Sequence, residues 1–272
     1  ESQEAIQAKA EEITDNEVKN SYGNLINGFS IDVKRKDVEE IANIPGVTKV
    51  TEATMYYPTM ATAVDLTQAR EVWESYGFDG EGLVVAIIDT GIDYTHKDMR
   101  LSDLEGAKIT DTNPEGPGKY YTDKVPYGYN FADGNDEIID TTSSMHGMHV
   151  AGIVGANASD EDYASGNGIR GVAPEAQLLA MKVFTNNPEV SGAYSDDIIA
   201  AIEDSVLHGA DIINMSLGSP SGYKSADDPE QIAIKRATVA GTICVVSAGN
   251  SSYSTDPYWF GAISDISTVG TP

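Results

Sequence analysis

The chain has 272 residues and a formal net charge of −26 at pH 7. That length accommodates one large α/β domain and a small one. The negative charge argues against nucleic acids and anionic membranes as partners, because both would be repelled. It is compatible with bound calcium, with a cationic substrate, or simply with an acidic and well-solvated surface. No apolar stretch is long enough to span a bilayer, and the single cysteine, Cys244, excludes an internal disulfide.

The first part of the chain, residues 1–57, differs in pattern from the rest. The predicted elements, in order, are a helix at Ala5–Ile13, strands at 18–23 and Gly28–Lys34, a helix at Lys36–Ile44 and a strand at Val47–Thr51. This order matches a split β-α-β arrangement that lacks its first strand. We therefore expect a small α+β domain here, followed by a second domain over residues 58–272.

From residue 66 onward, apolar strands alternate with helices. The predicted strands are Leu83–Asp89, Leu178–Val183, Ile212–Met215 and Thr242–Ser247. The predicted helices are Asp65–Tyr76, His146–Gly155, Ser195–His208 and Pro229–Ala240. Near-continuous apolar strands separated by helices favour an α/β fold, with a parallel sheet covered on both faces. Functional residues are then expected at the carboxyl ends of the strands.

Three polar residues stand at positions of that kind. Asp89 ends an apolar strand at a glycine turn, His146 opens a small-residue helix, and Asn250 follows a later strand. An acid that orients a histidine, with an amide aimed at an oxyanion, makes up most of a serine-protease site. No Gly-Thr-Ser-Met/Leu-Ala segment occurs in the sequence. The serine nucleophile is therefore expected outside this chain.

Four motifs occur in a fixed order: Asp-Thr-Gly-Ile-Asp from Asp89, His-Gly-Met-His-Val-Ala-Gly from His146, Asn-Met-Ser-Leu-Gly-Ser from Asn214, and Ser-Ala-Gly-Asn from Ser247. With them, roughly residues 66–272 resemble the subtilisin-like serine endopeptidases. The stretches that begin at His96 and Gly171, together with Met148, resemble in particular the lactocepin-type cell-envelope proteinases of Gram-positive bacteria and the related C5a peptidases. The resemblance implies a secreted or cell wall-associated enzyme that hydrolyses protein or peptide substrates and needs no cofactor for catalysis. On this interpretation, residues 58–272 are the N-terminal part of an incomplete subtilisin-like peptidase domain.

The resemblance also implies roles for individual residues. Asp89 would accept a hydrogen bond from His146, which would act as general base and then general acid, while Asn250 would donate to the oxyanion. The substrate would pair as an added strand with Ser216, Leu217 and Gly218. The facing wall of the S1 pocket would be formed by Ser247, Ala248 and Gly249.

The sequence suggests two candidate metal sites. Asp98 lies where subtilisins place a calcium ligand, and the acidic loop between Asn157 and Asn167 corresponds to the rest of that site. Solvated acidic turns would have the same sequence. A zinc site built from His146 and His149 is the rival to the protease interpretation, but no glutamate-based metalloprotease signature accompanies the pair. His149 is instead expected to serve packing or a structural hydrogen bond.

Residues 1–57 resemble the C-terminal part of a subtilase propeptide, through the segments Asn27–Val33 and Ile44–Val50. In that family the propeptide is a chaperone and an inhibitor, so the resemblance implies a zymogen. A generic small α+β domain is the alternative.

The expected partners are a peptide substrate and the serine-bearing C-terminal part of the protease, either continuous with this chain or separate. A non-catalytic pseudo-protease that acts as a binding or scaffold protein is the alternative function.

Overall fold

The computed structural model describes residues 2–22, 27–51, 64–190, 192–218 and 227–250. The chain divides into two compact units, residues 1–57 and residues 58–272. Each unit has its own hydrophobic core. In the described part of the chain, no helix combines the length and the apolar character that a membrane span requires.

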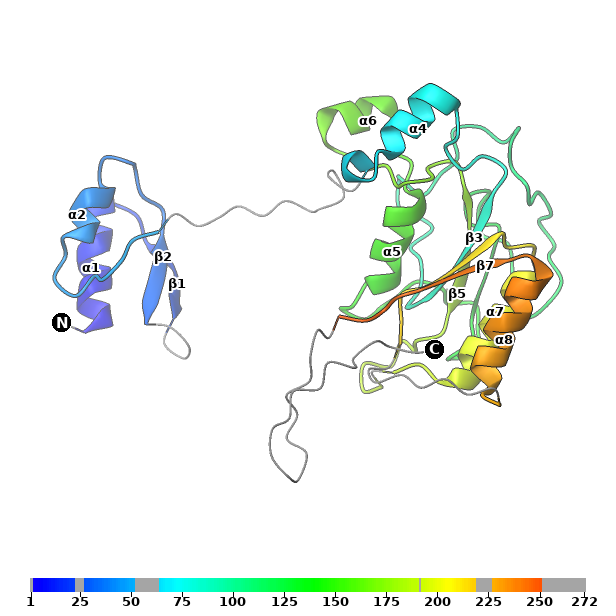
Figure 1. Cartoon of the computed structure of the whole chain (residues 1–272). Helices are drawn as coiled ribbons and strands as arrows, with labels where there is room; N and C mark the ends of the chain where they lie inside the picture. Colours follow the sequence, from blue (N-terminus) through cyan, green and yellow to red (C-terminus); the bar gives the residue numbers. More distant parts are fainter. Residues whose placement is uncertain (1, 23–26, 52–63, 191, 219–226, 251–272) are drawn as a thin grey trace. The chain divides into compact units, whose positions relative to one another are not determined.

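The N-terminal unit is a small α+β structure (Figure 1). Its elements are α1 (Gln3–Thr14), β1 (Val18–Tyr22), β2 (Gly28–Ile31) and α2 (Val38–Ala42), and the two strands pair antiparallel. Helix α1 begins where the Ser2 hydroxyl accepts from the N–H of Ala5, which satisfies one of the free donors at the helix start. The small core consists of Ile6, Ala10, Ile41 and Ile44.

Two predictions for this unit need correction. The predicted strand Val47–Thr51 is wrong, because this segment forms neither strand nor helix. In a split β-α-β arrangement the last strand pairs with the first, and the described residues offer no such first strand. The second helix is shorter than predicted, because it ends at Ala42 and a turn closes from Val47 N to Ile44 O at 3.0 Å.

The larger unit contains a five-stranded parallel sheet, which confirms the predicted fold class. The strand order is β4-β5-β3-β6-β7. The strands are β3 (Val84–Asp89), β4 (Tyr127–Asn130), β5 (Gln177–Lys182), β6 (Ile212–Met215) and β7 (Ile243–Val246). Because the strands are parallel, the segments that follow β3, β6 and β7 emerge at the same edge of the sheet.

Helices cover both faces of this sheet (Figure 1). Helix α5 (His146–Gly155) packs on one face, against Val85 and Ile87 of β3. Helices α7 (Ser195–Leu207) and α8 (Pro229–Ala240) pack on the other, against a set that includes Ile88. Alternate residues of β3 thus face opposite cores, as a central strand requires.

Three elements depart from the prediction. Helix α4 (Ala69–Tyr76) begins later than expected, because Gln68 adopts a left-handed conformation with φ 61° that interrupts the helix. Strand β4 was not predicted, since its four residues include Gly128 and carry no long apolar run. Helix α6 (Asp160–Ser165) lies within the predicted acidic loop, and the Ser159 hydroxyl caps it by accepting from the N–H of Asp162 at 3.1 Å.

Candidate active site

The structure brings Asp89 and His146 together. Asp89 is the last residue of β3 and His146 is the first residue of α5. The His146 Nδ1 atom lies 2.8 Å from Asp89 Oδ1, within hydrogen-bond distance. The Asp89 side chain is fully buried, whereas 51% of the His146 side chain is exposed. A buried acid thus holds one ring nitrogen, and the ring itself reaches the surface.

The carboxylate of Asp89 is supported by two hydrogen bonds. Its Oδ1 atom accepts from the N–H of Thr90 at 2.7 Å and faces the ring of His146. Burial raises the pKa of Asp89 above its ordinary value, while the hydrogen bonds from His146 and Thr90 oppose that rise because they stabilise the anion. The ionised form that orients a histidine therefore depends on these donors and on nearby charges.

Two motif glycines let the strand end and the helix start approach each other. A Cβ atom on Gly91, where φ is +127°, would lie 2.2 Å from the Ile138 carbonyl oxygen. A Cβ atom on Gly147 would lie 2.6 Å from the Gly91 carbonyl oxygen. The N–H of Gly147 also donates to the Thr90 hydroxyl at 2.9 Å. Gly147 therefore permits a close approach of the start of α5 to the turn after β3, which a larger residue would block.

The two predicted substrate-binding segments adjoin each other. Ser216, Leu217 and Gly218 follow β6, and Ser247, Ala248 and Gly249 follow β7. Ser247 donates from its N–H to Met215 O and from its hydroxyl to Leu217 O, both at 3.1 Å. These contacts place the two segments side by side at the carboxyl edge of the sheet.

The structure does not bring Asn250 into contact with the Asp89–His146 pair. Asn250 is exposed and lies beyond β7, and β6 separates β7 from β3. Its position at the same edge of the sheet agrees with the sequence prediction. Its proposed role as an oxyanion donor stays a prediction.

His149 does not pack as expected. It lies on α5 and is exposed, although the sequence interpretation assigned it a packing or structural role. Helix α5 is covered by the sheet on the side that carries Gly147, Val150 and Ala151, so His149 falls outside that buried stripe. Within the described ranges, no group of three or more His, Cys, Asp or Glu side chains could hold a metal ion.

Asp98 is buried and is held by protein donors. Its Oδ2 atom accepts from the N–H of Ile169 at 3.1 Å. In the adjoining loop, the Lys97 ammonium group donates to Asp162 Oδ2 at 3.0 Å and to Asn167 O at 2.8 Å. A protein cation thus already pairs with one of the carboxylates of this acidic loop. The described contacts do not assemble a calcium ligand set around Asp98, and they favour the alternative of a solvated acidic turn, which the next experiment tests.

Calcium should therefore affect the stability of this chain little. After treatment with a chelator, adding calcium is expected to raise Tm by less than about 1 °C, since a ligand stabilises only where it binds the native state. Replacing Lys97 with methionine should lower Tm by about 2 °C, a modest change because the ion pair is partly exposed. Differential scanning calorimetry measures both. A calcium-dependent rise above about 5 °C would instead support a calcium site at Asp98.

Sequence reasoning missed a set of buried polar residues behind the pair. Lys182 and Asp140 are almost completely buried, and both influence the electrostatics around Asp89. The available signal was the position of Lys182 inside the apolar strand Leu178–Val183, because an unpaired lysine is rarely buried in such a strand.

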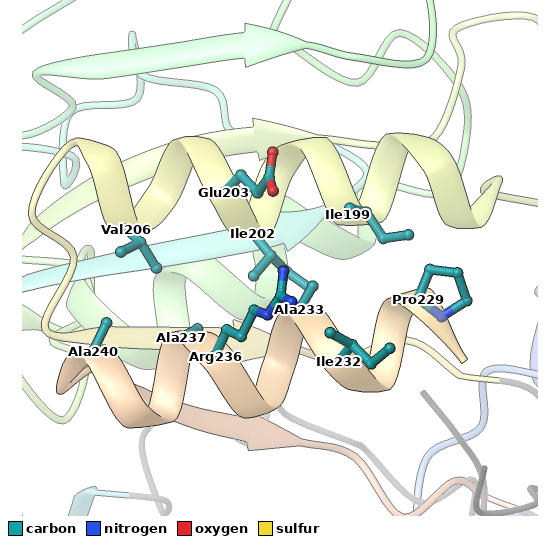
Figure 2. Close-up of a pocket in the computed structure, with 10 residues that line it drawn as sticks. All are labelled: Ile199, Ile202, Glu203, Val206, Pro229, Ile232, Ala233, Arg236, Ala237 and Ala240. Atoms are coloured by element: carbon teal, nitrogen blue, oxygen red, sulfur yellow. The ribbon is translucent and has the colours of Figure 1, made fainter. Parts of the chain in front are cut away.

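A groove between α7 and α8 is not the site (Figure 2). It is lined mainly by aliphatic side chains, among them Ile199, Ile202 and Val206. None of the predicted site residues lines it, and its two helices cover the sheet face opposite α5.

A parallel sheet with helices on both faces, and an acid hydrogen-bonded to a histidine at its carboxyl edge, are features that the subtilisin-like serine peptidases share. The comparison with protein families agrees. The Subtilase family profile matches residues 80–272, and the Peptidase inhibitor I9 profile matches residues 1–59. The chain belongs to the subtilase family.

Individual relatives support this assignment. A PII-type proteinase of Lacticaseibacillus paracasei is 47% identical over 283 residues, which cover 99% of this chain and 15% of that protein. A C5a peptidase of Streptococcus pyogenes is 33% identical over 198 residues, which cover 69% of this chain and 16% of that protein. Among solved structures, the Clostridium perfringens CspB protease matches with a TM-score of 0.50 and 25% identity, over 68% of this chain and 40% of that one. The chain thus spans only a small part of the length of these curated relatives.

Proposed function

We propose that this chain is the N-terminal part of a serine endopeptidase that hydrolyses peptide bonds by a Ser-His-Asp mechanism. Asp89 orients His146, His146 takes the proton of the nucleophile and returns it to the leaving amine, and Asn250 stabilises the oxyanion. The serine is supplied from outside residues 1–272. The observation that carries the proposal is the hydrogen bond between the buried Asp89 carboxylate and the half-exposed His146 ring.

Exposed apolar side chains on β7 support a place for the serine-bearing segment. In strand β7, Cys244 and Val246 pack toward the core beneath α8, and the alternate residues Ile243 and Val245 are 61% and 48% exposed. Ile243 and Val245 lie on the same face of the sheet as α5. Since strands of a parallel sheet are normally covered on both faces, a further helix is expected there, next to His146. A nucleophile on that helix would lie near the exposed edge of the imidazole.

The substrate class follows from the two segments at the sheet edge. A peptide can add as a strand along Ser216–Gly218, where main-chain hydrogen bonds bind it with little dependence on its sequence. Small residues at Ala248 and Gly249 leave room for a sizeable P1 side chain. By its resemblance to lactocepin-type proteinases, we place the whole enzyme outside the cell or on the cell wall of a Gram-positive bacterium. A nutritional protein and a host peptide would both fit such a cleft.

The N-terminal unit is proposed to be the C-terminal part of the propeptide. The match of residues 1–59 to the I9 inhibitors supports this role, as does the unit's own compact core. In an enzyme of this kind the propeptide assists folding and occupies the cleft until it is cut off.

A pseudo-protease is the alternative function. Such a protein would bind peptides at Ser216–Gly218 without cleaving them. The hydrogen-bonded pair of Asp89 and His146 favours the enzyme, because folding needs neither a buried carboxylate nor a half-exposed histidine beside it.

The proposal predicts that the chain alone does not hydrolyse peptides. Without a nucleophile, only the weak catalysis that remains from binding and oxyanion stabilisation is left. A chromogenic peptide should stay intact, and a fluorophosphonate serine probe should not label the purified chain. The same chain extended by its serine-bearing segment should hydrolyse the peptide and be labelled by the probe. Turnover by the chain alone, or none by the extended protein, would contradict the proposal.

A further inference from the structure

Charged side chains are enclosed in the domain behind the Asp89–His146 pair. Lys182 of β5 and Asp89 of β3 are direct partners in the register of the sheet, and neither residue is exposed. Asp140, from the segment that leads into α5, is 4% exposed. Charges removed from water interact strongly with one another. The protonation of the pair therefore depends on its buried neighbours.

Lys182 contacts the turn that carries Asp89. Its ammonium group donates to the carbonyl oxygen of Thr90. The N–H of Thr90 donates to the Asp89 carboxylate, and its hydroxyl accepts from Gly147 in the first turn of α5. One residue of the turn thus links the lysine to the carboxylate and to the helix that bears His146.

The lysine and the carboxylates of this cluster have opposite charges and attract one another. Burial lowers the pKa of Lys182, and the negative charges of Asp140, Asp133 and Asp89 oppose that shift. Three carboxylates thus favour the ionised lysine, one from the end of β3 and two from the connection between β4 and α5. By the same coupling, the ammonium favours the ionised form of each carboxylate.

Asp89 and Asp140 are both buried carboxylates, but only Asp89 has a raised pKa, because at Asp140 the effect of burial is outweighed by hydrogen bonds from Thr142. In each, the Oδ2 atom is buried and accepts no hydrogen bond from the described residues. Burial raises the pKa of Asp89, and the charge of Asp140 raises it further. A buried carboxylate oxygen without a donor is costly, so a nearby positive charge favours the ionised form. Lys182 supplies that charge.

On the basis of the proposed function, we propose that Lys182 is a positioning residue for the reaction: it holds the turn at Thr90 and keeps Asp89 ionised toward His146. It acts through Asp89 and does not touch the reacting atoms. Without its charge, each proton that the Asp89–His146 pair takes up would meet less repulsion. The pair would then bind its proton more tightly, whichever of its two members carries it.

The variant Lys182→Met tests this directly, because it removes the charge and keeps an unbranched apolar stem. The measurement is the titration midpoint of the Asp89–His146 pair, followed by NMR of the isotope-labelled His146 ring in the chain of residues 1–272. The midpoint should rise by about one pH unit, the size expected for a buried charge at several ångströms.

Lys124→Met is the matched control. Lys124 is equally buried, and its ammonium donates to the carbonyl oxygens of Pro174 and Ala176 at 2.7 and 2.5 Å. It lies near Gly155, at the end of α5 opposite His146. This variant should lose stability and leave the midpoint unchanged. An equal shift in both variants would mean that any buried lysine has this effect, and would overturn the proposal.

Asp140→Asn provides a second, independent test with the opposite sign. The amide oxygen can still accept from Thr142, which now donates its N–H and hydroxyl to Asp140 Oδ1 at 2.8 and 2.6 Å, but the negative charge is gone. The midpoint should fall. If Lys182→Met does not fold, Lys182→Gln takes its place, because it removes the same charge and keeps a polar group that can still donate to Thr90 O. A midpoint within about 0.2 units of the wild-type value in the folded variants would overturn the proposal.

The titration does not depend on hydrolysis. In the protein extended by its nucleophile, the acid limb of kcat/KM should move in the same directions as the midpoint. An extended wild-type protein that fails to hydrolyse peptides would count against the proposed function, while the NMR titration would still decide the role of Lys182.

Discussion

Replacing His146 with alanine, in a protein that contains the serine-bearing segment, should lower kcat about 10⁶-fold and change KM little. The size follows from the loss found when the triad histidine of a subtilisin is removed. The physical reason is that the ring held 2.8 Å from Asp89 Oδ1 would be the proton acceptor for the nucleophile. Steady-state kinetics with a chromogenic peptide measures the effect. A loss of proton transfer lowers kcat, whereas a loss of substrate binding would raise KM.

His149→Ala is the matched control for this experiment. His149 lies on the same helix and is exposed. Its removal should change kcat by no more than about twofold, as for most surface substitutions. Activity above about 1% of wild type in His146→Ala would contradict its role as the base, since general-base catalysis alone contributes at least that factor.

Much of the fold could be predicted because the apolar pattern and the topology agree. The runs that became β3 and β5 are almost wholly apolar, and helical segments separate the strands. Short apolar runs of this kind, bounded by turn residues, are typical of strands covered on both faces. The position of Asp89 at a strand end and of His146 at a helix start then followed from the motifs, and the structure has them hydrogen-bonded.

The segments that were mispredicted depend on neighbours rather than on their own sequence. Val47–Thr51 has β-branched residues at strand spacing but finds no strand to pair with. Helix α6 forms in an acidic stretch because Ser159 caps it and because Lys97 and Arg170 neutralise Asp162 and Asp160. Pairing and neutralisation of this kind are tertiary effects, which local patterns do not reveal.

The buried charges behind the site are the part of its chemistry that motifs concealed. Lys182 follows four apolar residues, a position typical of the end of a core strand. Asp140 lies in a polar loop. Only the register of β3 with β5 shows that Lys182 stands beside Asp89. A family motif identifies the residues that react, whereas the charges that tune them emerge from packing.

Release of the N-terminal unit is the second large effect that we expect. Subtilase propeptides leave after the enzyme cuts the junction, and the family spacing counted back from Asp89 places that cut within residues 55–63, all of which lie outside the described residues. A proline at position 58 makes a bond just before it hard to cut, so cleavage within 60–63 is expected. Joining the serine-bearing segment to this chain should therefore release residues 1 to about 60.

The release should depend on the same pair as peptide hydrolysis. His146→Ala and Asp89→Asn should each leave the joined chain uncut, since removing the base or its orienting acid lowers the rate by about 10⁴-fold or more. His149→Ala should be released like the wild type, which controls for damage to α5. N-terminal sequencing and intact mass of the purified proteins give the position and extent of cleavage. Release that persists in His146→Ala would show that another protease makes the cut. An uncut wild-type chain that hydrolyses added peptide would show that the N-terminal unit is not a propeptide removed by its own enzyme.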